Sequence, residues 1–152
     1  MATYYFRNVG TNWGDAANWS LTDGGGATGA VPTSLDDAYF TSNSGNCEIN
    51  ASARVCKTLV FSGVGAGNYA GTLTMTNGIT VSGNVTLSAT MTIAGASALT
   101  VNATATITSN GKTWPNALNL SNIITVTLGD TVTVTGNLVI STSSTVTVNS
   151  NT

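Results

Sequence analysis

The chain has 152 residues, a formal net charge of −2 and only 7% charged residues, against about a quarter in an average globular protein. Its length fits a single domain, and its 41% apolar content argues against disorder. The absence of a basic cluster argues against nucleic acid as a partner. No segment approaches the roughly 20 continuous apolar residues of a membrane-spanning helix, so we expect no membrane association.

Residues 1–56 are rich in aromatic, glycine and acidic residues and predict a separate N-terminal β module. The opening run lacks the basic start and the apolar core of a secretory signal, so we expect synthesis in a cytoplasm without export. Glycine and proline in residues 24–34 predict a long loop. We expect the module to cap or attach the rest of the chain, with packing or attachment roles for its aromatic residues: Tyr4, Tyr5, Phe6, Trp13, Trp19, Tyr39 and Phe40.

Few residues of the N-terminal module could carry chemistry. Asp36 and Asp37 are adjacent, so in a strand they would point to opposite faces and not act as an acid–base pair. They could stabilise the turn after Pro32 or, in a loop, bind calcium. Cys47 and Cys56 could form a disulfide or stay as two buried thiols. The chain has no histidine, which excludes Ser-His and Cys-His nucleophile pairs, so we expect no enzyme and no cofactor.

Residues 57–152 alternate threonine with aliphatic residues, the pattern of strands with one buried face. Successive apolar pairs, such as Ile79/Val81 and Val85/Leu87, recur six residues apart with Gly, Asn or Ser between them. A β-sandwich or jelly roll usually has turns about every 8–12 residues. Corners every six residues therefore favour a parallel β-solenoid, whose coil of three corners would take about 18–24 residues. The sandwich is the alternative fold.

The second region also repeats itself at longer range. Residues 79–93 match residues 132–148 at an offset of 53 (132 − 79), which predicts that one repeat spans two or three coils. Its Thr-x-Thr tracts have two interpretations. They are the solvent-facing residues of ordinary strands, or they form a grid of hydroxyl groups like that of ice-binding solenoids. Their irregular spacing favours the first interpretation.

One aromatic residue interrupts the alternation of the second region. Trp114 precedes Pro115, which cannot donate to a central ladder, so we expect an edge or a corner there. Trp114 would then cap a coil or pack against a neighbouring subunit. Stacking on a carbohydrate is the functional alternative for Trp114, Trp13 and Trp19.

The motifs of both regions resemble those of phage proteins. Trp13, Asn18-Trp19-Ser20, Pro32 and residues 36–40 (DDAYF) resemble the opening module of many phage virion proteins and are similar to autotransporter-type passenger repeats. The later course, with GTLTMTNGITVSGNVTL and SNGKTWPNAL, resembles the β-solenoid repeats of phage fibre, spike and decoration proteins. The resemblance implies a structural virion protein, commonly a homotrimer, that attaches to capsid or tail proteins and projects into solvent.

On this basis we expect a capsid decoration protein or a head spike, assembled in the host cytoplasm and extracellular once the virion is released. Two other classes are open. The chain could be an extracellular or cell-surface adhesin, or a module that binds glycans or ice.

Overall fold

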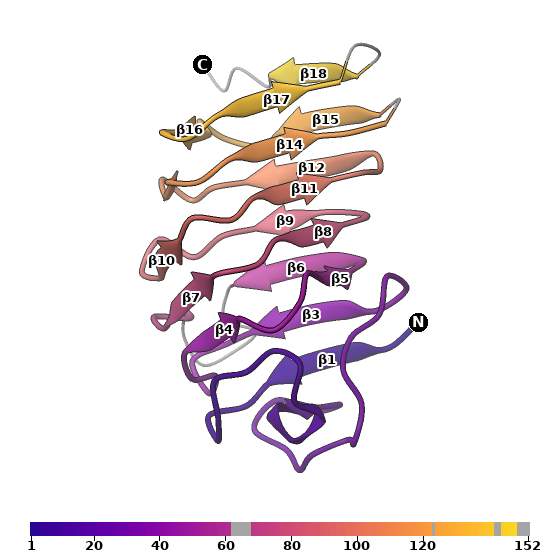
Figure 1. Cartoon of the computed structure of the whole chain (residues 1–152), viewed down its shortest axis with the longest axis vertical. Coiled ribbons are helices and arrows are strands. Elements are labelled where there is room, and N and C mark those ends of the chain that lie inside the picture. The colour runs from indigo at the N-terminus through magenta and orange to yellow at the C-terminus, as the bar shows by residue number, and fades with distance from the viewer. Residues whose placement is uncertain (62–67, 123, 142–143, 149–152) are drawn as a thin grey trace.

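The computed structural model describes residues 1–61, 68–122, 124–141 and 144–148 and shows an all-β solenoid of stacked coils (Figure 1). Its one helix in these ranges is the short 3-10 turn η1 (Ala16–Asn18). Within the described residues, the strand pairs are parallel except that of β1 with β2. The predicted parallel β-solenoid is therefore confirmed, and the sandwich alternative is not adopted.

Each coil contributes one strand to each of three faces, and about five coils follow one another along the axis. Face A is an eight-stranded sheet in the order β18-β15-β12-β9-β6-β3-β1-β2. Its strands are β1 (Thr3–Phe6), β2 (Trp19–Ser20), β3 (Asp37–Phe40), β6 (Thr58–Phe61), β9 (Val85–Thr86), β12 (Ala105–Thr108), β15 (Thr125–Leu128) and β18 (Thr145–Val148).

The other two faces follow face A in every coil. Face B holds β4 (Cys47–Ile49), β7 (Thr72–Met75) and β10 (Thr92–Gly95), and the pair β13 (Thr113–Trp114) and β16 (Thr133–Val134) takes the same place in later coils. Face C is the five-stranded sheet β5 (Arg54–Cys56), β8 (Ile79–Val81), β11 (Leu99–Val101), β14 (Leu118–Leu120) and β17 (Leu138–Ile140).

The length of a coil can be read from the pairing of equivalent residues. Ile79 pairs with Leu99 on face C, and Leu99 pairs with Leu118 in the next coil. The early coils take more residues, since Leu59 pairs with Val85 on face A. The parallel pairing also crosses the change in composition near residue 56, because β3, β4 and β5 pair with β6, β7 and β8.

The 53-residue sequence repeat spans between two and three coils, as predicted, but not a whole number of them. Ile79 begins β8 on face C, whereas its counterpart Val132 precedes β16 on face B. The match arises because all three faces use the same alternation of inward aliphatic and outward threonine residues. The pattern therefore reports the strand period and not the coil period.

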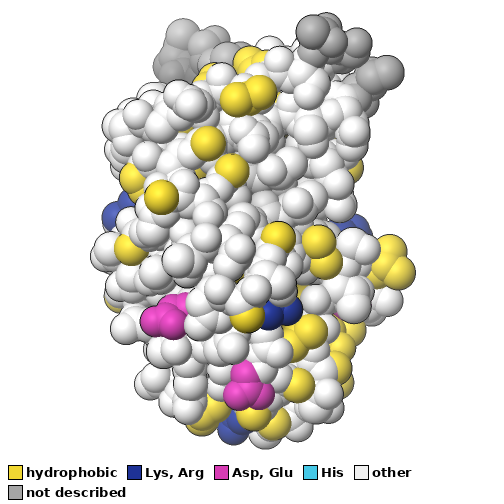
Figure 2. Space-filling view, viewed as in Figure 1, with side chains coloured by type: hydrophobic (Ala, Val, Ile, Leu, Met, Phe, Trp, Pro, Cys, Tyr) yellow, Lys and Arg dark blue, Asp and Glu magenta, His cyan; other side chains and the backbone are white. Residues whose placement is uncertain are grey.

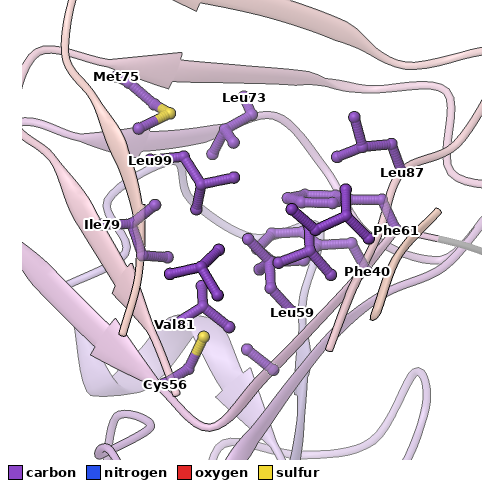
Figure 3. Packing of buried hydrophobic residues seen from close by; sticks show 14 of the residues in the cluster. Phe40, Cys56, Leu59, Phe61, Leu73, Met75, Ile79, Val81, Leu87 and Leu99 are labelled. Atoms are coloured by element: carbon purple, nitrogen blue, oxygen red, sulfur yellow. The ribbon is translucent and has the colours of Figure 1, made fainter. Parts of the chain in front are cut away.

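Alternate residues of each strand point into one continuous apolar core. Figure 3 shows part of it, with the rings of Phe40 and Phe61 stacked beside the aliphatic side chains from faces B and C. Along face A the interior carries an aromatic stack, in which Phe40 lies 5.1 Å from Phe6 and 4.5 Å from Phe61 between ring centroids. In the next coil the register gives the position after Phe61 to Leu87, a buried aliphatic residue.

Candidate functional site

The large aromatic residues of the N-terminal region close that end of the solenoid from inside. Phe6, Trp13, Trp19 and Phe40 are at most 1% exposed. The rings of Trp13 and Trp19 meet edge to face at 4.8 Å, and the indole Nε1 of Trp19 donates to the carbonyl of Trp13 at 2.7 Å. The rings of both tryptophans are thus inaccessible to a sugar ring.

Trp114 lies far along the chain but is also buried, at 2% exposure. It sits in β13 and its Nε1 donates to the carbonyl of Ala117 at 3.2 Å, across the corner that contains Pro115. It therefore packs inside its own coil.

The tyrosines of the N-terminal region occupy different positions. Tyr4 packs against the core, whereas Tyr5 and Tyr39 are partners across β1 and β3 with ring centroids 5.6 Å apart. Both are half-buried. Desolvation raises the pKa of Tyr39, and the neighbouring Asp37 and Tyr5 raise it further. Cross-strand pairing accounts for their position.

Around this end, the exposed apolar side chains are aliphatic. Val9, Leu21 and Leu35 are 61%, 55% and 69% exposed. They lie in segments between strands, where the alternation of apolar and polar residues gives no indication of exposure, so they escaped the sequence analysis. With Met1, which is 85% exposed, they are accessible apolar side chains that the N-terminal region offers to a partner.

The two cysteines are free, fully buried thiols. Cys47 lies in β4 on face B and Cys56 in β5 on face C. Burial raises the pKa of both thiols, with smaller contributions from Glu48 at Cys47 and from Asp37 at Cys56. Since the thiolate is the reactive form, both side chains are chemically quiet packing groups.

Asp36 accepts hydrogen bonds from side-chain and backbone donors. Asp36 accepts from the hydroxyl of Thr33 at 2.6 Å and from the amide of Ala2 at 2.7 Å. The bond from Thr33 is the main cause of its lowered pKa. This geometry fits the interpretation of Asp36 as a turn stabiliser. Within the described residues, no group of three or more His, Cys, Asp or Glu side chains could hold a metal ion.

Asp130 performs a similar task between coils. Its two carboxylate oxygens accept from the backbone amides of Ser109 at 2.7 Å and Asn110 at 2.6 Å, one coil earlier. Asn110 has a positive φ of 50°, and the hydrogen bond from its backbone amide to Asp130 holds this corner in place. The bonds join two successive corners of the solenoid.

Threonines form an ordered array on the outer side of face A. Thr106 pairs with Thr127, which pairs with Thr147, and Thr125 pairs with Thr145. The amide of Thr125 also donates to the hydroxyl of Thr104, at 3.5 Å. Thr-x-Thr thus recurs once per coil in β12, β15 and β18. The tracts are unevenly spaced in the sequence, but the coiling of the chain brings these three into register, so the expectation that they do not recur once per coil is wrong on this part of face A.

The strands β16, β17 and β18 form the last described coil. Within the described residues, each of these strands lies at the edge of its sheet and pairs on one side. By register, Leu138 and Ile140 occupy the inward positions that Leu118 and Leu120 occupy one coil earlier. Leu138 is 54% exposed and Ile140 is 44% exposed, whereas Leu118 and Leu120 are 3% and 2% exposed.

The surface is short of charge over most of its length. Figure 2 shows the acidic side chains of this view over the lower, N-terminal half, whereas the upper half is almost free of charge. After Asp130 the sequence contains no charged residue. Among the residues that the structure describes, no helix is long and apolar enough to cross a bilayer.

No known protein family, curated protein or solved structure matches this chain. Two features are candidates for a functional surface: the unlike ends of the solenoid and the threonine array on face A.

Proposed function

We propose that this chain is a structural protein of a bacteriophage particle, a capsid decoration protein or a head spike that self-associates. The observation that carries the proposal is the difference between the two ends of the solenoid. One end is closed by buried aromatic side chains and surrounded by the exposed aliphatics Val9, Leu21 and Leu35. The other is the last described coil, which is uncharged and has Leu138 and Ile140 exposed.

A rigid connection between the ends supports the same role. The strands of face A join coil to coil from β1 to β18 through parallel ladders. Inter-coil side-chain bonds reinforce the ladders at several corners, for example from Asn122 Nδ2 to the carbonyl of Asn102 at 2.9 Å. A scaffold of this kind holds two contact surfaces at a fixed separation. That is a useful property for a protein that projects from a particle.

The N-terminal aliphatics are the proposed attachment surface. Apolar side chains that are more than half exposed become favourable contacts once a partner removes them from water. A carboxylate introduced among them would have to be desolvated on attachment and would weaken it. Leu35→Asp tests this point, and Thr131→Asp, at an exposed residue near the other end, is the matched control.

The test is incorporation into particles. Particles purified from a lysate of cells that carry the gene should contain the chain at a copy number that matches capsid sites. Leu35→Asp should reduce the bound amount at least tenfold, and Thr131→Asp should leave it unchanged. Particles that form normally and never contain the chain would overturn the proposal.

The threonine array favours a second candidate, a face that binds ordered water or ice. Adjacent strands lie about 4.8 Å apart, which sets the spacing of the Thr106, Thr127 and Thr147 column. In a tetrahedral network with oxygens about 2.8 Å apart, two waters bonded to the same third water lie about 4.5 Å apart. The hydroxyl column therefore comes close to the second-neighbour spacing of tetrahedral water.

An ice-recrystallisation assay tests the second candidate. The native chain should inhibit recrystallisation, and Thr127→Tyr should abolish the inhibition because it breaks the flat array. Thr133→Tyr, on face B, is the control. A native chain without any effect on ice growth would eliminate this candidate and leave the structural role untouched.

A further inference from the structure

The chain contains two Asn-Gly steps, Asn77-Gly78 and Asn110-Gly111. Such a step carries its own reaction, because the backbone nitrogen of the glycine can attack the side-chain amide carbon of the asparagine. Glycine favours the attack, since it has no Cβ to restrict the backbone rotation that closes the five-membered ring. Both steps lie at corners of the solenoid, the first between β7 and β8 and the second between β12 and β13 (Figure 1).

The two asparagines themselves are held in nearly the same way. Asn77 Nδ2 donates to the carbonyl of Asn50, one coil earlier, at 2.8 Å. Asn110 Nδ2 donates to the carbonyl of Leu87, also one coil earlier, at 2.7 Å. The backbone amides of both asparagines donate as well, at 2.8 and 2.6 Å. The anchoring of the asparagines therefore does not distinguish the two sites.

The glycine nitrogens, which are the attacking atoms, differ between the sites. The nitrogen of Gly111 donates to the hydroxyl of Ser109 at 3.1 Å, and Asn110 and Gly111 have left-handed φ angles of 50° and 77°. A hydrogen bond that the nitrogen donates holds its proton in place and lowers its reactivity. Within the described residues, the nitrogen of Gly78 donates no hydrogen bond, and Asn77 has no positive φ. The attacking atom is therefore free at the first site and engaged at the second.

We propose that Asn77 is a site of self-catalysed deamidation in the folded chain and that Asn110, although more exposed, is protected. A bond forms from the nitrogen of Gly78 to Cγ of Asn77, and the Cγ–Nδ2 bond breaks. Ammonia leaves with the proton of the glycine amide, and a cyclic succinimide remains. Water then opens either of the two ring C–N bonds, which gives aspartate or isoaspartate at residue 77. The inference goes beyond the proposed function and does not depend on it.

The modification would act on the ladder that joins β5 to β8. Isoaspartate adds one methylene to the backbone between the nitrogen of Asn77 and the carbonyl of Gly78. That nitrogen donates to the carbonyl of Ile49 at 2.8 Å, and that carbonyl accepts from the amide of Arg54 at 3.0 Å. Both products also lose the Nδ2 donor and place a carboxylate beside the carbonyl of Asn50. Deamidation would therefore loosen the bonds between two successive coils.

Mass spectrometry of the aged full chain tests the proposal with an internal comparison. One tryptic peptide, residues 58–112, contains both asparagines, and electron-transfer fragmentation distinguishes aspartate from isoaspartate at each of them. In the native chain at mildly alkaline pH, Asn77 should deamidate at least about fivefold faster than Asn110, the factor that one typical hydrogen bond gives when it must break first. In guanidinium chloride the difference should disappear, because the contacts that distinguish the sites are lost.

Two variants test the role of the glycine nitrogens. Ser109→Ala removes the acceptor of Gly111, so the rate at Asn110 should rise toward that at Asn77. Gly78→Ala adds a Cβ that hinders the attack, and the position accepts it with a small shift, so the rate at Asn77 should fall. In each variant the other asparagine is the control, and its unchanged rate would show that the fold is intact.

Hydrogen exchange measures the effect on the ladder. The amide of Arg54 should exchange at least about fivefold faster in chains modified at Asn77 than in unmodified chains. The amide of Leu118, which donates to the carbonyl of Asn137 at 2.9 Å in later coils, should exchange at the same rate in both. An unchanged rate at Arg54 would contradict the effect on the ladder.

Three outcomes of the aging experiment would overturn the proposal. In the native chain, both asparagines could react at the same rate, or Asn110 could react faster than Asn77. In the third outcome, neither asparagine reacts in the native chain, although both react in guanidinium chloride. A rate at Asn110 that Ser109→Ala leaves unchanged would overturn the protective role of the hydrogen bond from Gly111.

Discussion

Replacing Phe40 with alanine should be among the most destabilising single changes in this chain. The ring is fully buried, and five other rings border it, with centroids between 4.5 and 5.8 Å away. Truncation of a buried phenylalanine costs about 3–5 kcal/mol. Because aromatic neighbours add to the loss, we expect a value at the upper end, about 5 kcal/mol, and a fall in Tm of about 10–20 °C.

The adjacent residue provides the control. Tyr39 lies on the same strand, points outward and has its main ring contact with Tyr5. Tyr39→Ala should therefore cost about 1 kcal/mol or less. Urea unfolding followed by tryptophan fluorescence is the assay, since Trp13 and Trp19 both lie against Phe40.

The difference in unfolding free energy between the two variants decides the test. If Phe40→Ala and Tyr39→Ala differ by less than about 1 kcal/mol in unfolding free energy, the aromatic stack does not close the N-terminal end. A transition with an unchanged midpoint for Phe40→Ala would refute the account outright.

Three further predictions concern backbone fit, inter-coil bonds and thiols. Gly95→Ala should destabilise the fold by about 3 kcal/mol, because the φ of Gly95 is +88° and an added Cβ would lie 2.2 Å from the carbonyl oxygen of Met75. Gly111 has a φ of +77° but open space around it, so Gly111→Ala should cost only about 1–2 kcal/mol. Thermal melts of both variants measure the difference. Asp130→Ala removes two charge-assisted bonds and should cost about 1.5–3 kcal/mol, whereas a urea midpoint equal to that of the native chain would show that the corner does not need them. Cys47 and Cys56 should both be silent toward Ellman's reagent at pH 8 in the native chain and react in denaturant. Because burial raises their folded pKa, stability should fall as pH rises above the ordinary value of 9.0, and a double alanine variant should lessen that fall.

The architecture could be predicted because it depends on local chemistry. Alternation along strands such as β7 and β8 fixes which side chains point inward, and the small polar residues between the strands fix the corners. Corners every six residues leave no room for hairpins. The alternation and the corners recur along the chain, so a few irregular segments do not change the prediction of a β-solenoid.

Features that depend on register between coils could not be predicted in the same way. Corners of different length make the interval from Thr106 to Thr127 one position longer than the interval from Thr127 to Thr147, which hides the column in the sequence. The exposure of Leu138 is hidden as well, because Leu138–Ile140 has the same pattern as the buried Leu118–Leu120. Burial there depends on a neighbouring coil and not on the residues themselves.

The direction of the ladders also determines how the molecule responds to force. The bonds between coils run along the solenoid axis, so a pull along that axis opens each ladder from its edge, one coil after another. A coil such as the one that separates Asn102 from Asn122, about 20 residues, releases about 70 Å of extended chain. The solenoid would therefore lengthen under tension in discrete steps of one coil and would absorb energy stepwise.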